Sequence, residues 1–124
     1  MEEKICCMFE GKNATLAVRN RDLERIAVYW ESSRTEKYLY RCRRCGRLVY
    51  YSCEEIANLY GGWDNADIFE DYIPVVGEVK DAGDGEEVKK ALTLRRTIHG
   101  HNMEEDALSS YSYEFVDRRE ETET

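Results

Sequence analysis

Alternating apolar and polar positions dominate the first third of the chain, and they predict short β-strands. Residues 5–10 and 14–19 are rich in apolar and β-forming residues, and the Gly-Lys-Asn sequence at 11–13 between them is typical of a hairpin turn. Leu23–Trp30 fits the period of a helix face as well as that of a strand, but its Ile-Ala-Val-Tyr-Trp run favours a strand. This part of the chain therefore predicts the start of an antiparallel sheet.

The strongest local pattern surrounds the sequence Cys-Arg-Arg-Cys-Gly at residues 42–46. Tyr38 and Tyr40 alternate before it, and Val49 and Tyr51 alternate after it, as expected for two strands joined by a turn. A Cys-x-x-Cys turn lets two thiolates converge on one metal ion, and the glycine after it can take the left-handed backbone conformation of such a turn. We therefore predict a hairpin with a metal-binding knuckle at its tip.

Residues 58–76 are less regular. Asn58–Asp71 contains two glycines, a tryptophan and four acids, so we expect an ordered but irregular loop held in place by Trp63 and Phe69. Tyr72–Val76 resumes an extended pattern. Because proline cannot donate to a β-ladder, Pro74 predicts that this segment is an edge strand or the start of a strand.

The last third of the chain predicts two short helices and one strand. Asp84 is a suitable N-cap for a helix over residues 86–92, and a second helix is expected to begin at Asn102. Residues 111–116 alternate as in a half-buried strand. Residues 119–124 are almost all charged or threonine, which predicts a disordered acidic tail.

Length and composition predict a single α+β domain over residues 1–118. A chain of 124 residues with 42% hydrophobic residues can build one core. The expected fold is an antiparallel β-sheet with a zinc-knuckle hairpin and one or two short helices.

The net charge of −8 restricts the classes of partner. A general nucleic-acid binder needs a basic surface, so the charge argues against that class and favours a basic protein partner. The apolar run after the acidic N-terminus ends at Phe9, too short for a signal peptide or a membrane segment. We therefore expect a cytoplasmic protein that does not bind a membrane.

Five cysteines are present, and their odd number and the Cys-x-x-Cys spacing indicate reduced thiols or a metal site. Zinc bound by Cys42 and Cys45 is the first hypothesis. Cys6 and Cys7 are the natural suppliers of a third ligand, because the predicted first strand could lie beside the knuckle. Successive strand side chains point to opposite faces, so we expect one of these two to bind zinc and the other to lie in the core, unless the strand is locally irregular.

The sequence leaves the fourth ligand open. His99 and His101 are the only histidines and would share one face of a strand, although exposed loop positions are an equal alternative. Cys53 would lie roughly 25 Å from Cys45 along an extended strand at about 3.3 Å per residue, so we expect it to be a small buried hydrophobe.

Two other functions fit parts of the hairpin. Arginines near Cys42 and Cys45 could activate a redox thiol pair, but thioredoxin-like motifs open a helix, whereas strands are predicted on both sides here. Six basic residues and one acid lie between Arg34 and Arg47, and with the neighbouring tyrosines they could form a nucleic-acid surface. Pairing of these arginines with the acidic block that follows the hairpin is the simpler expectation.

That acidic block is the predicted docking surface for a basic partner. Aromatic residues beside acids are typical of binding hot spots. The residues expected to contact the partner are Trp63, Asp64, Asp67, Glu70, Asp71 and Tyr72. The sequence contains neither a Ser/His/Asp arrangement nor a phosphate-binding glycine loop, so we predict a protein without enzymatic activity.

The hairpin and the segment after it also resemble a known group of proteins. Residues 40–51, 62–67 and the Tyr-Ile-Pro-Val block at 72–75 are similar to small bacterial Cys-x-x-Cys-Gly knuckle proteins of largely uncharacterised function. Some of these resemble immunity proteins of polymorphic-toxin systems. The likeness covers residues 38–76, and it implies an accessory binding protein with a toxin as a candidate for the basic partner.

Overall fold

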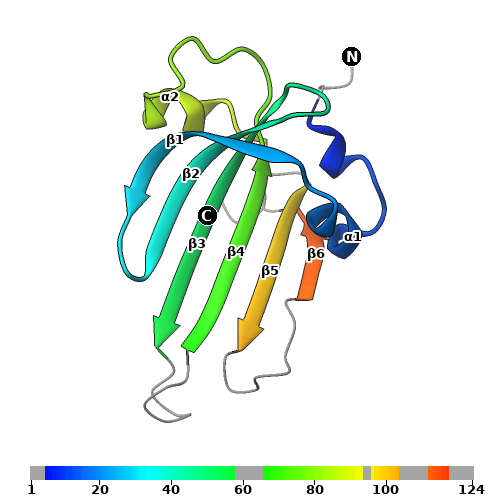
Figure 1. The fold of residues 1–124 in the computed structure, drawn as a ribbon, viewed down its shortest axis with the longest axis vertical. Helices are drawn as coiled ribbons and strands as arrows, with labels where there is room; N and C mark the ends of the chain where they lie inside the picture. The colour runs from blue at the N-terminus through cyan, green and yellow to red at the C-terminus, as the bar shows by residue number, and fades with distance from the viewer. Residues whose placement is uncertain (1–4, 58–65, 94–95, 104–111, 118–124) are drawn as a thin grey trace.

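Six antiparallel strands form one sheet, in which their order is the same as their order along the chain (Figure 1). The computed structural model describes residues 5–57, 66–93, 96–103 and 112–117. The strands are β1 (Leu23–Glu31), β2 (Thr35–Cys42), β3 (Leu48–Ala57), β4 (Ala66–Pro74), β5 (Thr97–Met103) and β6 (Ser112–Val116).

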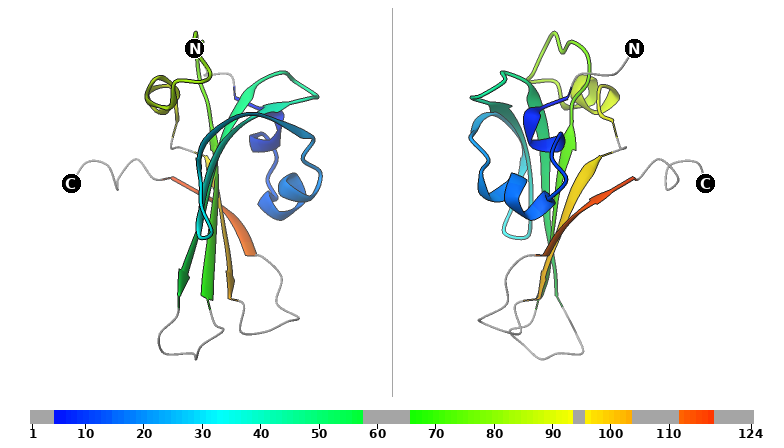
Figure 2. Two further views of the ribbon diagram at one scale, coloured as in Figure 1. Left: turned by 60° about the vertical axis from the view of Figure 1, so that its left-hand side comes forward. Right: turned by 90° about the vertical axis from the view of Figure 1, so that its right-hand side faces the viewer.

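Three short helices accompany the sheet in the described part of the chain. They are η1, a 3₁₀ helix over Cys7–Phe9, and the α-helices α1 (Ala14–Arg19) and α2 (Gly85–Lys90). The edge-on views show η1 and α1 on one face of the sheet and α2 on the opposite face (Figure 2). Short helices therefore pack on both faces.

This arrangement divides the buried residues into two clusters. Phe9, Val49 and Ile98 are fully buried in the cluster on the side of η1 and α1. Leu39 and Val88 are fully buried in the cluster beneath α2. Because side chains of a strand alternate between faces, neighbouring residues of β2 and β3 supply both clusters.

The predicted strands over residues 5–10 and 14–19 are wrong, because both segments contain helices. Asn13 caps α1, with its Oδ1 accepting a hydrogen bond from the Leu16 N–H at 3.0 Å. Ala14 and Val18 lie four residues apart and are both buried, as on one face of a helix. The cap residue and this spacing were present in the sequence as helix signals.

The predicted hairpin is confirmed. β2 and β3 pair antiparallel with Tyr38 opposite Tyr51 and Tyr40 opposite Val49. Gly46 in the connecting turn has φ of 77°, the left-handed conformation predicted for it. The strand predicted over Leu23–Trp30 is confirmed as β1, which pairs with β2.

The predicted irregular loop is wrong for residues 66–71, which belong to β4. Nor is β4 an edge strand, since it pairs with β3 on one side and β5 on the other. Pro74 is tolerated because it is the last residue of the strand, where a missing N–H interrupts no further ladder bonds. The remainder of the predicted loop lies outside the described residues.

The predicted helix after Asp84 is confirmed as α2. The Asp84 carboxylate accepts hydrogen bonds from the N–H groups of Glu86 and Glu87, at 3.1 and 3.4 Å. Val88 anchors the helix on the sheet because its side chain is fully buried. Sequence alone thus located this helix through its cap.

Removal of this cap gives a modest stability prediction. We expect Asp84→Ala to lower the free energy of unfolding by about 1 kcal/mol, because two N–H groups lose their acceptor. Urea denaturation followed by circular dichroism measures the change. Asp84→Asn is the control and should be close to wild type, since asparagine is an equally good cap. An unchanged Asp84→Ala variant would show that the cap adds nothing.

The end of the chain agrees with the sequence only in part. The strand predicted over 111–116 is found as β6. The helix expected from Asn102 is wrong at its start, because Asn102 and Met103 belong to β5. Its remaining residues and the predicted tail at 119–124 lie outside the described part of the chain.

An antiparallel sheet with short helices is therefore confirmed, although the fold is mostly β and only loosely α+β. Among the described residues, no helix combines the length and apolar character required to span a membrane.

Candidate metal centre

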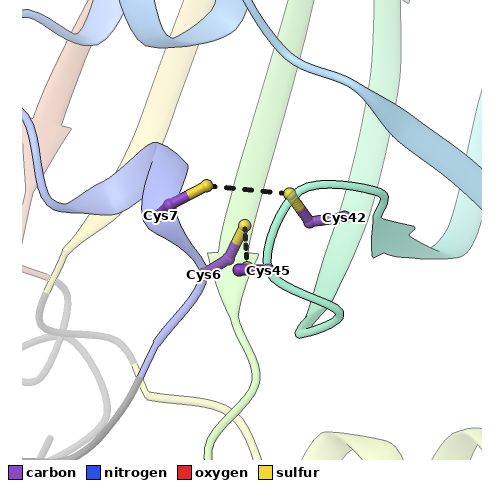
Figure 3. A group of neighbouring side chains, drawn as sticks. All are labelled: Cys6, Cys7, Cys42 and Cys45. Carbon is purple, nitrogen blue, oxygen red and sulfur yellow. Dashed lines mark hydrogen bonds between the residues drawn. The ribbon is translucent and has the colours of Figure 1, made fainter.

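Four cysteines from two distant segments meet at one end of the sheet (Figure 3). Cys6 and Cys7 lie at η1, Cys42 ends β2, and Cys45 lies in the turn that follows. Their four Sγ atoms all lie within 4.8 Å of one another. This group could hold a metal ion.

The distances between the sulfurs suit tetrahedral coordination. The Sγ atoms of Cys7 and Cys42 are 3.7 Å apart, and so are those of Cys45 and Cys6. Zinc–sulfur bonds of about 2.3 Å place tetrahedral ligands roughly 3.8 Å apart, whereas a disulfide needs about 2.0 Å. The cysteines are free, these two distances match those between ligands of one ion, and all four sulfurs lie within 4.8 Å of one another.

The turn between β2 and β3 positions the first pair of thiols. The Gly46 N–H donates to the Cys42 carbonyl at 2.8 Å, and the Cys42 N–H donates to the Arg47 carbonyl at 2.9 Å. These bonds and the left-handed φ at Gly46 close the chain into a tight knuckle. Cys42 and Cys45 therefore face the same point.

The second pair reaches the knuckle because the N-terminal segment is not a strand. Cys6 is extended, with φ of −56° and ψ of 144°, whereas Cys7 is the first residue of η1. The change of conformation between them removes the strict alternation of a strand. Both sulfurs therefore face the knuckle, because the segment has the local irregularity that the sequence left open as the exception to a single ligand.

Packing and Arg96 hold this N-terminal segment against the sheet. Phe9 is fully buried, and its carbonyl accepts a hydrogen bond from Arg96 Nε at 2.7 Å. The same guanidinium donates to the Gly11 carbonyl at 2.7 Å and lies 4.0 Å from the ring centroid of Phe115. No local sequence pattern marks Arg96 for this role, because the carbonyls to which it donates lie more than 80 residues away.

Cys6, Cys7 and Cys45 differ in how readily their thiols ionise. Burial raises the pKa of Cys6, and it raises the pKa of Cys7 to about 11. Burial also acts on Cys45, but hydrogen bonds from the backbone N–H groups of Cys7 and Arg47 and from neighbouring thiols lower its pKa to about 7. A bound dication would stabilise thiolates at all four positions, because its charge offsets their desolvation.

The two histidines lie elsewhere. His99 and His101 share one face of β5, as an extended segment predicts, and each contacts an aspartate of β4. His99 Nδ1 is 2.8 Å from Asp71 Oδ1, and His101 Nε2 is 3.2 Å from Asp67 Oδ1. Neither belongs to the cysteine group, so the candidate fourth ligand is the second cysteine of the vicinal pair.

Cys53 is also outside the group, as predicted. It lies on β3 and is half-buried, and burial raises its pKa. It therefore offers a control thiol within the same chain.

Two residues of the predicted acidic docking surface are buried, so that part of the prediction is wrong. Glu70 is 7% exposed and Tyr72 is 1% exposed, because both face the core on the side of η1 and α1. The Glu70 carboxylate accepts hydrogen bonds from the hydroxyls of Tyr51, Tyr72 and Tyr113 at 3.1, 3.2 and 3.3 Å. This network accounts for a buried carboxylate, which needs such donors.

The other residues predicted for that surface have different positions. Asp67 and Asp71 lie on the opposite face of β4 and are partly exposed beside the histidines. Trp63 and Asp64 lie outside the described residues. Strand alternation thus separates acids that the sequence suggested as one surface.

The tyrosines of the hairpin do not form an exposed stacking platform. Tyr38 and Tyr50 are buried, and Tyr38 stacks on Tyr51 with ring centroids 6.0 Å apart. Arg43 pairs with Asp22 at 3.4 Å and with Glu24 at 3.7 Å rather than with the acids after the hairpin. Arg43 and these tyrosines therefore make contacts within the protein.

No protein-family model matches the chain, and neither the curated proteins nor the solved structures that were compared with it show significant similarity. The resemblance to bacterial knuckle proteins stays a prediction. The cysteine geometry is the feature from which a function can be argued.

Proposed function

We propose that this chain is a non-enzymatic zinc protein, in which one zinc ion fastens the N-terminal segment to the β2–β3 knuckle and the protein acts by binding another protein. The observation that carries the proposal is the convergence of Cys6, Cys7, Cys42 and Cys45 within 4.8 Å. Four thiolates are a common ligand set of structural zinc.

The composition of the centre supports a structural role. Catalytic zinc sites usually have three protein ligands and leave one position for water or substrate, whereas four thiolates fill a tetrahedral site. The pairs of ligands are also separated by 35 residues of sequence, so the metal would close a long loop. Zinc would thus restrain η1 against the sheet.

The predicted basic protein partner, with a toxin as one candidate, remains part of the proposal. It is supported by the net charge of −8. Among the described residues of the predicted surface, Asp67 and Asp71 are the acids that remain partly exposed. If these acids contact the basic partner, the double variant Asp67→Lys/Asp71→Lys should bind it more weakly, and the affinity of wild type for it should fall as salt is added.

Metal analysis combined with thiol titration tests the centre directly. We expect one zinc ion per chain, and four thiols that react with Ellman's reagent only after a chelator is added. Cys53 is the fifth thiol and should react at the same rate with and without chelator. In Cys53→Ser, the four protected thiols should remain and the unprotected one should disappear.

A thiol redox protein is the second candidate, because Cys45 is exposed within the cluster. The same titration distinguishes the two functions. Purified protein without zinc, whose cluster thiols react equally with and without chelator and interconvert with disulfides, would contradict the zinc proposal and favour the redox function.

A further inference from the structure

A hollow of about 400 Å³ lies beside the cysteine group, and two of the four cysteines, Cys7 and Cys42, belong to its lining. One wall comes from η1, α1 and the segment that joins them. The other wall comes from residues 21–23 at the start of β1 together with Cys42 and Arg44. We call this hollow the basic groove.

The proposed zinc centre connects the two walls. Cys7 belongs to the first wall and Cys42 to the second, and their sulfurs are 3.7 Å apart. A metal ion held by both would fix the width of the groove. In this respect the inference rests on the proposed function.

The lining combines aliphatic and cationic side chains. Leu16 is 55% exposed although it is apolar, and Ala17 and Leu23 continue the apolar surface. Lys12, Arg21 and Arg44 supply the cations of the lining, all of them exposed.

One acid faces these three cations. The carboxylate of Asp22 is 3.4 Å from Arg43, which lies outside the lining, so its charge is already partly compensated. The groove is therefore locally positive in a chain whose net charge is −8. A positive site in an acidic protein indicates a ligand with negative charge.

We propose that the basic groove binds an acidic segment of a partner protein through an aliphatic side chain that packs on Leu16 and carboxylates that contact Arg21 and Arg44. The lining contains no aromatic side chain, so it offers no stacking surface for a nucleic-acid base. Sites for small molecules usually enclose most of the ligand, whereas Leu16 and the cations around this groove remain open to solvent. A peptide segment that continues beyond the groove fits such an open site.

Titration with peptides of defined charge tests this inference. The ligand is the acetylated peptide Asp-Glu-Leu-Leu-Asp-Glu, and the controls are Asp-Glu-Ala-Ala-Asp-Glu and Lys-Lys-Leu-Leu-Lys-Lys. Amide chemical shifts of the zinc-loaded protein should move around Leu16, Leu23 and Arg44 with the first peptide. Each control peptide should bind at least about tenfold more weakly than the acidic peptide. Added salt should lower the affinity of the acidic peptide, because it screens the contacts between opposite charges.

Two pairs of matched variants locate the site. Arg44→Glu should weaken binding roughly tenfold or more, whereas Arg34→Glu, the same charge change in the exposed β1–β2 turn, should have a small effect. Leu16→Gln should also weaken binding, whereas Ile56→Gln, at another exposed aliphatic position, should not. Wild-type protein stripped with chelator should lose affinity if the metal fixes the two walls.

The zinc content of each sample separates failure of the groove from failure of the metal centre. Zinc-loaded protein that binds none of the peptides at about 1 mM, or binds all three equally, overturns the groove inference and leaves the proposed zinc centre intact. Chelator-stripped protein that keeps its full affinity for the acidic peptide overturns only the link between the metal and the groove. Protein that is purified without zinc and still binds the peptide at these residues contradicts the zinc centre and leaves the groove inference standing. A single-stranded oligonucleotide that binds here in place of the peptide overturns the assignment to a protein segment.

Discussion

Cys42→Ser is expected to abolish stoichiometric zinc binding and to lower the free energy of unfolding by on the order of 5 kcal/mol. Structural zinc in small domains binds with about 10–16 kcal/mol of apparent free energy. Cysteines of the unfolded chain also bind the metal, so only part of this free energy stabilises the folded state. For a domain of this size, about 5 kcal/mol corresponds to a melting temperature lower by roughly 20 °C.

The effect should be largest at the N-terminal segment. Cys42 is 3% exposed and its sulfur lies 3.7 Å from that of Cys7, so its replacement removes a direct link between η1 and the knuckle. Arg96 still bonds to the carbonyls of Phe9 and Gly11, and the ladders of the sheet are unaffected. We therefore expect near-native circular dichroism at low temperature with a much earlier thermal transition.

Cys53→Ser is the matched control, since Cys53 is outside the metal-binding group. It should keep one zinc per chain and a melting temperature close to that of wild type. Chelator should lower the stability of wild type and Cys53→Ser, but should hardly change Cys42→Ser. Equal stabilities of the two serine variants, combined with no response to chelator, would show that the four thiols form an ordinary metal-free cluster.

Gly100→Ala is expected to destabilise the protein by about 2–3 kcal/mol through a steric clash. Gly100 of β5 is paired with Tyr113 of β6, whose ring lies across the glycine. A Cβ atom added at Gly100 would lie 2.6 Å from Cδ1 of that ring and still closer to Cε1. The contact is too short, so the ring or the strand must move.

The ring is not free to move without further cost. The Tyr113 hydroxyl donates a hydrogen bond to Glu70 Oε1 at 3.3 Å. Displacement of the ring would weaken this hydrogen bond, on which the buried Glu70 carboxylate depends. Chemical denaturation measures the loss, and Gly11→Ala is the control because an added Cβ there has nothing within 4 Å. In a Tyr113→Ala background, Gly100→Ala should cause little further loss of stability, because the ring that it clashes with is absent. A fully additive double variant would exclude the clash.

Local signals explain the elements that the sequence predicted correctly. The knuckle depends on a glycine that can adopt φ of 77°, and α2 depends on the Asp84 cap, both of which act within a few residues. The alternation of β2 and β3 is also local. In contrast, α1 was missed because its residues are compatible with both a strand and a helix, and β4 because its polar residues obscure the strand period.

The sequence by itself determined the first half of the candidate metal centre, Cys42 and Cys45, because two thiols three residues apart in a tight turn must lie close together. It also supplied Cys6 and Cys7 as candidates, of which a regular strand would allow only one to be a ligand. Only the tertiary structure decided that both join the group, because the turn into η1 and the packing of that segment depend on contacts with residues far along the chain. Long-range packing likewise decided that Glu70 and Tyr72 face the core, which no local pattern of charge reveals.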